Sequence, residues 1–279
     1  MGLERLDVQL AAQAVLESDR LGSRRDLKST EKGANRAHSI TRFKQTMSIN
    51  APYQLYGGQL SYFTGKVRAY LLWKRLPFVE VVASASVYRE IIVPRVGFPV
   101  IPVIVTPNDE TLQDTTDIID ALERRHPEPS VYPTTPLQRL VALLLEVYGD
   151  EWLVIPAMHY RWHYNRDWAI KSFGELIAPN ATPDEQLVIG AKRAGPFANA
   201  AVLLGAEPHM HNAIEDSYTA FLKDLDLHFA THDFTLGDRA SIADFSLFGP
   251  PCTRICIGIP RAANSCVNSR RMSFDGFIG

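Results

Sequence analysis

The turn from Gly57 to Lys66 holds the residues best suited to chemistry. Gly57 and Gly58 end a short alternating segment, and the hydroxyl residues Ser61 and Tyr62 follow where a helix should begin. The first N–H groups of a helix have no partner within it and lie at the positive end of its dipole, so an anion bound there gains roughly 0.3 to 1 kcal/mol. We therefore expect this turn to stabilise a bound anion.

Histidines form the other pattern that suggests chemistry. His159 and His163 are four residues apart, which would place both on one face of a helix. The sequence supplies neither a third ligand nor an adjacent Glu, so we expect no metal ion there. His209 and His211 form a still weaker pattern.

The charge and cysteine content limit the classes of molecule that the protein could bind and the reactions it could perform. The 29 Lys and Arg against 31 Asp and Glu give a formal net charge of −2, which removes the electrostatic case for binding nucleic acid or an anionic membrane. All three cysteines follow Gly249, so a thiol–disulfide exchange at the turn, which needs a sulfur nucleophile, is disfavoured. We expect a soluble, cytoplasmic protein that binds small molecules or a second copy of itself.

The elements that position this turn alternate between strands and helices. Apolar spacing and turn residues predict strands over 53–56, 78–82 and 100–105, a hairpin arm over 111–113, and helices starting near 62 and 115. Pro102 interrupts the third strand, so we expect a cis bond between Ile101 and Pro102. Asp114 should cap the second helix, which ends near His126.

This order of elements resembles the thioredoxin-like domain of the glutathione transferase superfamily. Ser61 to Arg68 resembles its active-site turn and first helix, residues 101–103 resemble its cis-proline motif, and residues 113–115 occupy the place of its acidic-hydroxyl pair. The resemblance implies an α/β thioredoxin-like domain followed by an all-α helical bundle domain. We expect these domains to span residues 51–130 and 135–250.

The resemblance also implies an activity. It predicts a homodimeric glutathione S-transferase, as in detoxification, that activates the glutathione thiol for addition to a small electrophile. A non-catalytic binding or interaction module with the same fold is the alternative. Because the superfamily carries an activating Ser, Tyr or Cys at or next to this position, Ser61 is the expected hydroxyl donor and Tyr62 the competitor. A simple helix cap is the alternative role of Ser61.

Further residues take roles from the same resemblance. Ile101 would pair with the main chain of glutathione beside Pro102, Asp114 would bind the ammonium of its γ-glutamyl end, and Thr115 would bind the carboxylate there. The alternative for Asp114 and Thr115 is a plain capping pair. Lys66 is expected to be a solvated helix charge, and so is Arg68.

An aromatic-rich segment of the helical half is expected to line the electrophile pocket through His159, Trp162 and His163, with plain core packing as the alternative. Nothing in its charge pattern points to a particular electrophile. Farther along, Ser241 and Asp244 form the acidic variant of a capping box, which resembles the superfamily's helical-domain signature.

Both ends of the chain differ from its middle. Residues 1–50 are rich in charge and poor in large apolar side chains, so we expect a disordered extension, with Met47 as the natural start. Residues 251–279 have neither helical nor strand periodicity. A shifted reading frame compatible with this segment encodes an amphipathic helix, so we expect a frameshift near Pro251; a genuine unusual tail is the alternative.

Overall fold

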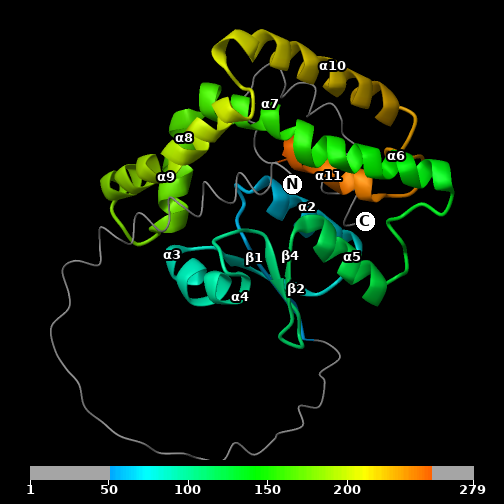
Figure 1. Cartoon of the computed structure of the whole chain (residues 1–279), viewed down its shortest axis with the longest axis horizontal. Coiled ribbons are helices and arrows are strands. Elements are labelled where there is room, and N and C mark those ends of the chain that lie inside the picture. Colours follow the sequence, from blue (N-terminus) through cyan, green and yellow to red (C-terminus); the bar gives the residue numbers. More distant parts are fainter. Residues whose placement is uncertain (1–50, 253–279) are drawn as a thin grey trace, which may run out of the picture.

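A four-stranded mixed sheet forms the first part of the chain, in a computed structural model that describes residues 51–252 (Figure 1). The strands are β1 (Tyr53–Gly57), β2 (Phe78–Val82), β3 (Val103–Val105) and β4 (Thr111–Gln113), in the order β2-β1-β3-β4. β1 pairs with β2 in parallel, and the other pairs are antiparallel. All four predicted strands are present, but β3 begins only after Pro102, whose nitrogen cannot donate to a ladder.

Two helices, α2 (Tyr62–Trp73) and α5 (Thr115–Arg125), pack against the sheet and bury its core. Both begin where the sequence predicted. Three short helical turns that were not predicted lie between β2 and β3: α3 (Ala85–Val87), η1 (Tyr88–Ile92) and α4 (Val93–Val96). Ile92 is fully buried there, and Val87, Tyr88 and Val96 pack against the same small core. Each turn is only three to five residues long, too short for apolar periodicity to indicate a helix.

A helical part follows the sheet and lies above it in Figure 1. Its elements are α6 (Pro136–Val147), η2 (Tyr148–Trp152), α7 (Val154–His159), η3 (Tyr160–Tyr164), α8 (Arg166–Ile177), α9 (Pro183–Leu203), η4 (Pro208–Met210), α10 (His211–Phe229) and α11 (Ile242–Cys252). The break predicted near Gly149 is present, because regular helix gives way there to a π-helical turn. The predicted fold class is confirmed.

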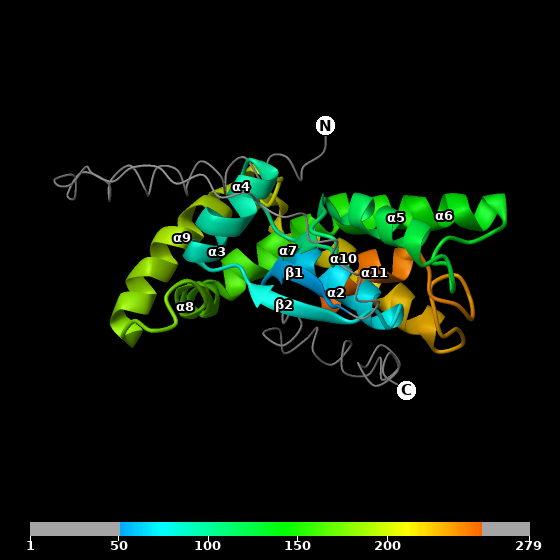
Figure 2. The ribbon, with the colours of Figure 1, turned by 90° about the horizontal axis from the view of Figure 1, so that it is seen from below.

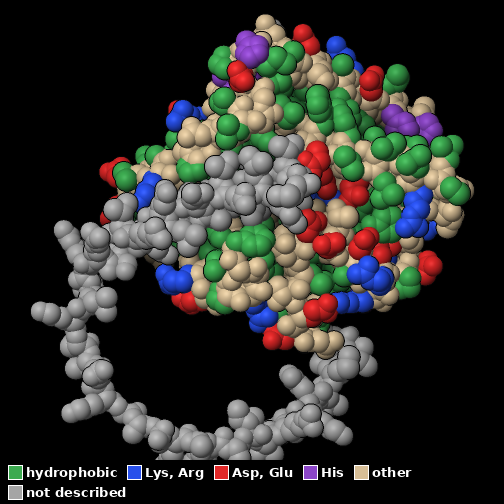
Figure 3. Space-filling model, viewed as in Figure 1, with side chains coloured by type: hydrophobic (Ala, Val, Ile, Leu, Met, Phe, Trp, Pro, Cys, Tyr) green, Lys and Arg blue, Asp and Glu red, His purple; other side chains and the backbone are tan. Residues whose placement is uncertain are grey.

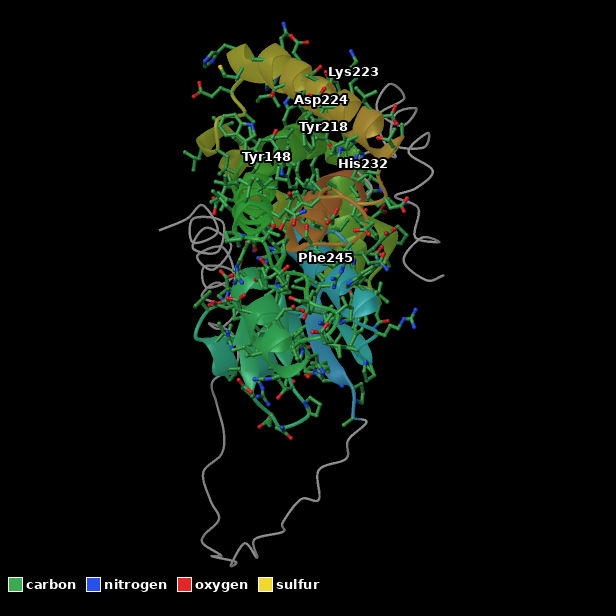
Figure 4. All side chains as sticks on the ribbon, turned by 90° about the vertical axis from the view of Figure 1, so that its right-hand side faces the viewer. Tyr148, Tyr218, Lys223, Asp224, His232 and Phe245 are labelled. Atoms are coloured by element: carbon green, nitrogen blue, oxygen red, sulfur yellow. The ribbon has the colours of Figure 1, made fainter. Side chains whose placement is uncertain are left out.

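Helix α11 joins the two parts, since it packs against both α2 and α6. The carboxylate of Asp244 accepts hydrogen bonds from the backbone N–H and hydroxyl of Ser241 and from the same groups of Thr235, at 2.5 to 2.9 Å. The predicted acidic capping interaction is thereby confirmed. One turn in, the ring of Phe245 is fully buried at the junction and meets Tyr70 edge-on, with ring centroids 5.7 Å apart (Figure 4).

The predicted extension and the predicted frameshifted tail lie outside the described residues, and the domain limits stay predictions. No single helix of residues 51–252 is long and apolar enough to cross a membrane. Helices α9 and α10 meet that criterion only as a pair bent by 60°.

Candidate functional site

A cavity of about 170 Å³ lies between the sheet part and the helical part. Six residues predicted for the site line it: Ser61, Tyr62, Ile101, Pro102, Asp114 and Thr115. Helices α7, α8 and α9, together with Arg161 of η3, supply the helical side of the wall. The strand ends and helix starts of the sheet part thus converge on one face of the cavity.

Ser61 is the N-cap of α2. Its backbone is extended, with φ −82° and ψ 122°, and its side-chain oxygen accepts a hydrogen bond from the N–H of Thr64 at 3.1 Å. A hydroxyl has one donor and two acceptor positions, so this cap leaves its hydrogen available to a ligand. The capping role and the donor role are therefore compatible.

The hydroxyl of Tyr62 is bound to carbonyl groups that do not line the cavity. The hydroxyl donates to the carbonyl of Gly149 at 2.5 Å and lies 3.4 Å from the carbonyl of Ser246. Burial raises the pKa of Tyr62 well above its ordinary value, and the nearby carboxylate of Asp150 adds to this. Only the ring of Tyr62 contributes to the cavity, because its polar atom ties α2 to the helical part.

Gly57 allows the last residue of β1 to pack on α2. A Cβ at this position would lie 2.4 Å from the methyl carbon of Thr64 and 2.6 Å from its hydroxyl oxygen. Thr64 is fully buried, so its short side chain has nowhere to move. The glycine therefore sets how closely the strand approaches the helix start at Ser61.

The cavity is also lined by the bend before β3 and by the start of α5. The Ile101–Pro102 peptide bond is cis, as predicted. Asp114 has a φ of 75°, which is uncommon for a residue with a side chain and costs about 1–3 kcal/mol, and its carboxylate caps α5 by accepting from the N–H of Thr116 at 3.0 Å. Thr115 is only 1% exposed, and its hydroxyl oxygen has no hydrogen-bond partner within the described residues.

Lys66 is not a solvated charge, contrary to the sequence prediction. It is 0% exposed, and its ammonium lies 2.8 Å from Glu146 and 2.5 Å from Asp150. Burial favours a lower pKa for Lys66, but the two carboxylates outweigh it and the pKa is raised. Burial raises the pKa of Asp150 to about 6, against the opposing effect of the ammonium. Glu146 also accepts from the Thr116 hydroxyl at 2.8 Å, which links this cluster to the start of α5.

The prediction for Arg68 is likewise wrong. Its guanidinium forms two hydrogen bonds to Glu80 on β2, at 2.6 and 2.7 Å, and the two side chains are each little more than a fifth exposed. The periodicity of α2 places Arg68 on the face toward the sheet edge, where an acidic strand residue meets it.

Comparisons with known proteins agree with this architecture. Residues 55–130 match the family model of the glutathione S-transferase N-terminal domain. Solved structures similar to the chain include a glutathione S-transferase from Rhodospirillum rubrum F11, with 17% identity and a TM-score of 0.52, over 81% of this chain and 90% of that chain. The chain therefore has the glutathione transferase fold.

Two further structures share the fold. A glutathione S-transferase from Methylobacterium radiotolerans JCM 2831, in complex with glutathione sulfonate, has 20% identity and a TM-score of 0.51, over 82% of this chain and 93% of that chain. Beta-etherase LigF from Sphingobium sp. strain SYK-6 has 15% identity and a TM-score of 0.58, over 82% and 97%. No curated protein matches this glutathione transferase-fold chain by sequence. Identities this low establish the fold and not the activity.

The predicted histidines, His159 and His163, lie outside the lining of the cavity. His159 is buried, with its Nε2 2.9 Å from a carboxylate oxygen of Glu215, and its ring centroid lies 5.2 Å from that of His163 and 4.4 Å from that of His211. Neither His159 nor His163 is among the residues that line the cavity. No group of three or more His, Cys, Asp or Glu in residues 51–252 could hold a metal ion.

Trp162 lies behind the cavity rather than in its wall. Its ring stacks on those of Phe173 and Phe197, with centroids 6.1 and 6.4 Å away, and these two phenylalanines line the cavity. Neither phenylalanine was predicted from the sequence, and neither were Arg161 and Arg193 of the same wall. They come from η3, α8 and α9, and no local motif connects these segments, so only the folded chain reveals them.

Proposed function

We propose that this chain is a glutathione S-transferase in which Ser61 stabilises the thiolate of glutathione for attack on a small electrophile. One observation carries the proposal: the free hydroxyl hydrogen of Ser61 at the start of α2 and the buried, unpartnered hydroxyl of Thr115 at the start of α5 line the same cavity. Two helix starts in one cavity suit a ligand that carries two separate anionic groups.

Glutathione fits the polar groups of the sheet side. Asp114 would hold the ammonium of the γ-glutamyl end, and Thr115 would donate to the adjacent carboxylate, which supplies the partner that its hydroxyl lacks. The main chain of Ile101, beside the cis bond to Pro102, would pair with the peptide of glutathione. The solved relative from Methylobacterium radiotolerans, which has this fold, is in complex with glutathione sulfonate.

The chemistry then needs little from the protein beyond Ser61. A hydrogen bond from its hydroxyl to the sulfur favours the thiolate over the thiol, so the proton leaves to solvent and more nucleophile is present at neutral pH. The sulfur attacks an electrophilic carbon held against the wall of α7, α8 and α9. Tyr62 takes the structural role described above, and the electrophile wall moves from the histidine segment to Phe173 and Phe197.

We also propose a cytoplasmic homodimer. Leu137, Leu140, Leu144 and Val147 lie on one face of α6, and each is more than half exposed. Figure 3 shows hydrophobic side chains over the helical part on the face where α6 lies. An apolar stripe of this kind marks a protein–protein contact, and a second copy of the chain would cover it. Sedimentation velocity at increasing concentration tests this.

Three Ser61 variants test the transferase proposal. Ser61→Ala removes both the donor and the cap, whereas Ser61→Gly removes the donor at a helix-cap cost of only a few tenths of a kcal/mol, and Ser61→Thr keeps both. A hydrogen bond to a charged acceptor contributes about 1.5–3 kcal/mol, so we expect the Gly and Ala variants to lose roughly 10- to 100-fold in kcat/KM for conjugation.

Glutathione-agarose retention accompanies the rate measurement as the control for binding. The Thr variant should retain most activity, and all variants should still bind. Retention without turnover in every protein, the wild type included, would instead identify a non-catalytic binding module.

A further inference from the structure

The helical wall of the cavity, against which the electrophile would lie, carries two positive charges. Binding of a purely apolar electrophile would not require them. Arg161 of η3 and Arg193 of α9 both line the cavity among aromatic and aliphatic side chains. Asp114, across the cavity at the start of α5, is the one acidic residue in the lining contributed by the described chain, and glutathione would engage it. The helical wall is therefore apolar and cationic at once.

Arg193 is held by aromatic rings rather than by a carboxylate. Its guanidinium carbon lies 5.9 Å from the ring centroid of Tyr88 and 5.7 Å from that of Phe197, and its position brings α9 alongside the α3–α4 segment (Figure 2). No ion pair formed within residues 51–252 includes Arg193. Ring faces attract a cation but leave its charge in place, so an anion that enters the cavity meets an uncancelled, partly buried positive charge.

Arg161 adds to this potential near the start of α2. Its Nη2 donates to the carbonyl of Leu60 at 2.9 Å, which fixes the guanidinium next to the residue that precedes Ser61. The positive end of the α2 dipole lies at the same place. An anionic group on the electrophile would thus be attracted toward the nucleophile.

We propose that the electrophile is an aromatic acid, whose ring packs on the aromatic wall and whose carboxylate binds the guanidinium of Arg193. As a statement about a substrate this rests on the transferase function proposed above. The preference of this wall for an aromatic acid as a ligand does not depend on that function. The experiment below therefore tests ligand preference and turnover separately.

Binding is measured by calorimetry with two unreactive probes of matched shape, 3-nitrobenzoate and 3-nitrobenzamide, in the presence of S-methylglutathione. The glutathione analogue fills its own site, so an effect of Arg193 on glutathione cannot mimic an effect on the probe. The wild type should bind the acid about 10- to 100-fold more tightly than the amide, as expected for a charge-assisted hydrogen bond. Arg193→Gln should abolish this ratio, Arg193→Lys should keep part of it, and Arg166→Gln, at an exposed position on α8, should leave it intact.

Equal affinity of the wild type for both probes overturns the proposal, and so does an acid preference that survives in Arg193→Gln. Weaker binding of S-methylglutathione to that variant, with no acid preference in the wild type, would assign Arg193 to a carboxylate of glutathione and also overturn it.

Turnover of 4-chloro-3-nitrobenzoate with glutathione reports on the transferase function separately: the sulfur bonds to the ring carbon that bears chlorine, chloride leaves with the bonding electrons, and the thiol proton passes to solvent. Acid preference without turnover would retain the ligand class and reject the transferase.

Discussion

Replacing Lys66 with methionine tests how the sheet part is joined to the helical part. The change keeps an unbranched apolar stem but removes the ammonium that lies 2.8 Å from Glu146 and 2.5 Å from Asp150, with all three side chains nearly or fully buried. At an effective dielectric constant of about 20, a charge pair 2.8 Å apart attracts by roughly 6 kcal/mol. Desolvation offsets much of this attraction, but removing one partner leaves two carboxylates buried without compensation, which costs about 3–5 kcal/mol.

The loss of stability in Lys66→Met should become smaller as the pH falls. Burial already raises the pKa of Asp150 to about 6, and loss of the ammonium removes the main influence that opposes this shift. A carboxyl group whose pKa in the folded state exceeds its unfolded value destabilises the fold above that pKa and ceases to do so as it becomes protonated. The variant should therefore recover part of its stability as the pH falls from about 8 toward about 5.

Urea denaturation at several pH values measures this, with Lys171→Met as the matched control. Lys171 pairs with Glu175 at 3.9 Å, and both side chains are more than half exposed, so its loss should change the free energy of unfolding little. A Lys66→Met cost below about 1 kcal/mol, or a cost that does not vary with pH, would refute the role assigned to the buried cluster.

Two further predictions concern packing and protonation. Gly57→Ala should lower the free energy of unfolding by about 1–3 kcal/mol and impair conjugation, because its Cβ would meet Thr64 at 2.4 Å; a melting temperature equal to that of the wild type would contradict this. Burial lowers the pKa of His159, so the folded state binds this proton less readily than the unfolded chain does. The resulting contribution to stability is lost as the pH falls below about 6.5, where the unfolded chain takes up the proton. His159→Gln should flatten the decline in stability between about pH 7 and pH 5, as measured by thermal denaturation, and an unchanged slope would assign the decline to other groups.

Local signals were sufficient for most of the elements and for the residues that line the sheet side of the cavity. Helix caps such as Asp114 and Asp244 act within three residues of the positions they cap, so the sequence reveals them directly. Contacts over long sequence separations were not predictable in this way. Lys66 resembles an exposed helix residue because its partners, Glu146 and Asp150, lie 80 and 84 residues away.

The helical wall of the cavity could not be predicted from the sequence for the same reason. An aromatic segment suggested Trp162, which does touch the wall, but it packs behind Phe173 and Phe197 rather than facing the cavity. The spacing of aromatic residues along one segment does not show which side chain is outermost once other helices pack on it. The short turns at 85–96 were missed because each is only three to five residues long, too short for apolar periodicity to indicate a helix.

Helix α11, which joins the two parts, affects how the chain can fold during its synthesis on the ribosome. It is the last element of the described chain, yet it covers α2, which begins at Tyr62 and is among the first to be made. Its fully buried Phe245 has to reach Tyr70, 175 residues earlier in the sequence. The sheet part therefore waits for most of the chain to be synthesised before its core closes, and during that interval its unsealed apolar surface is available to chaperones.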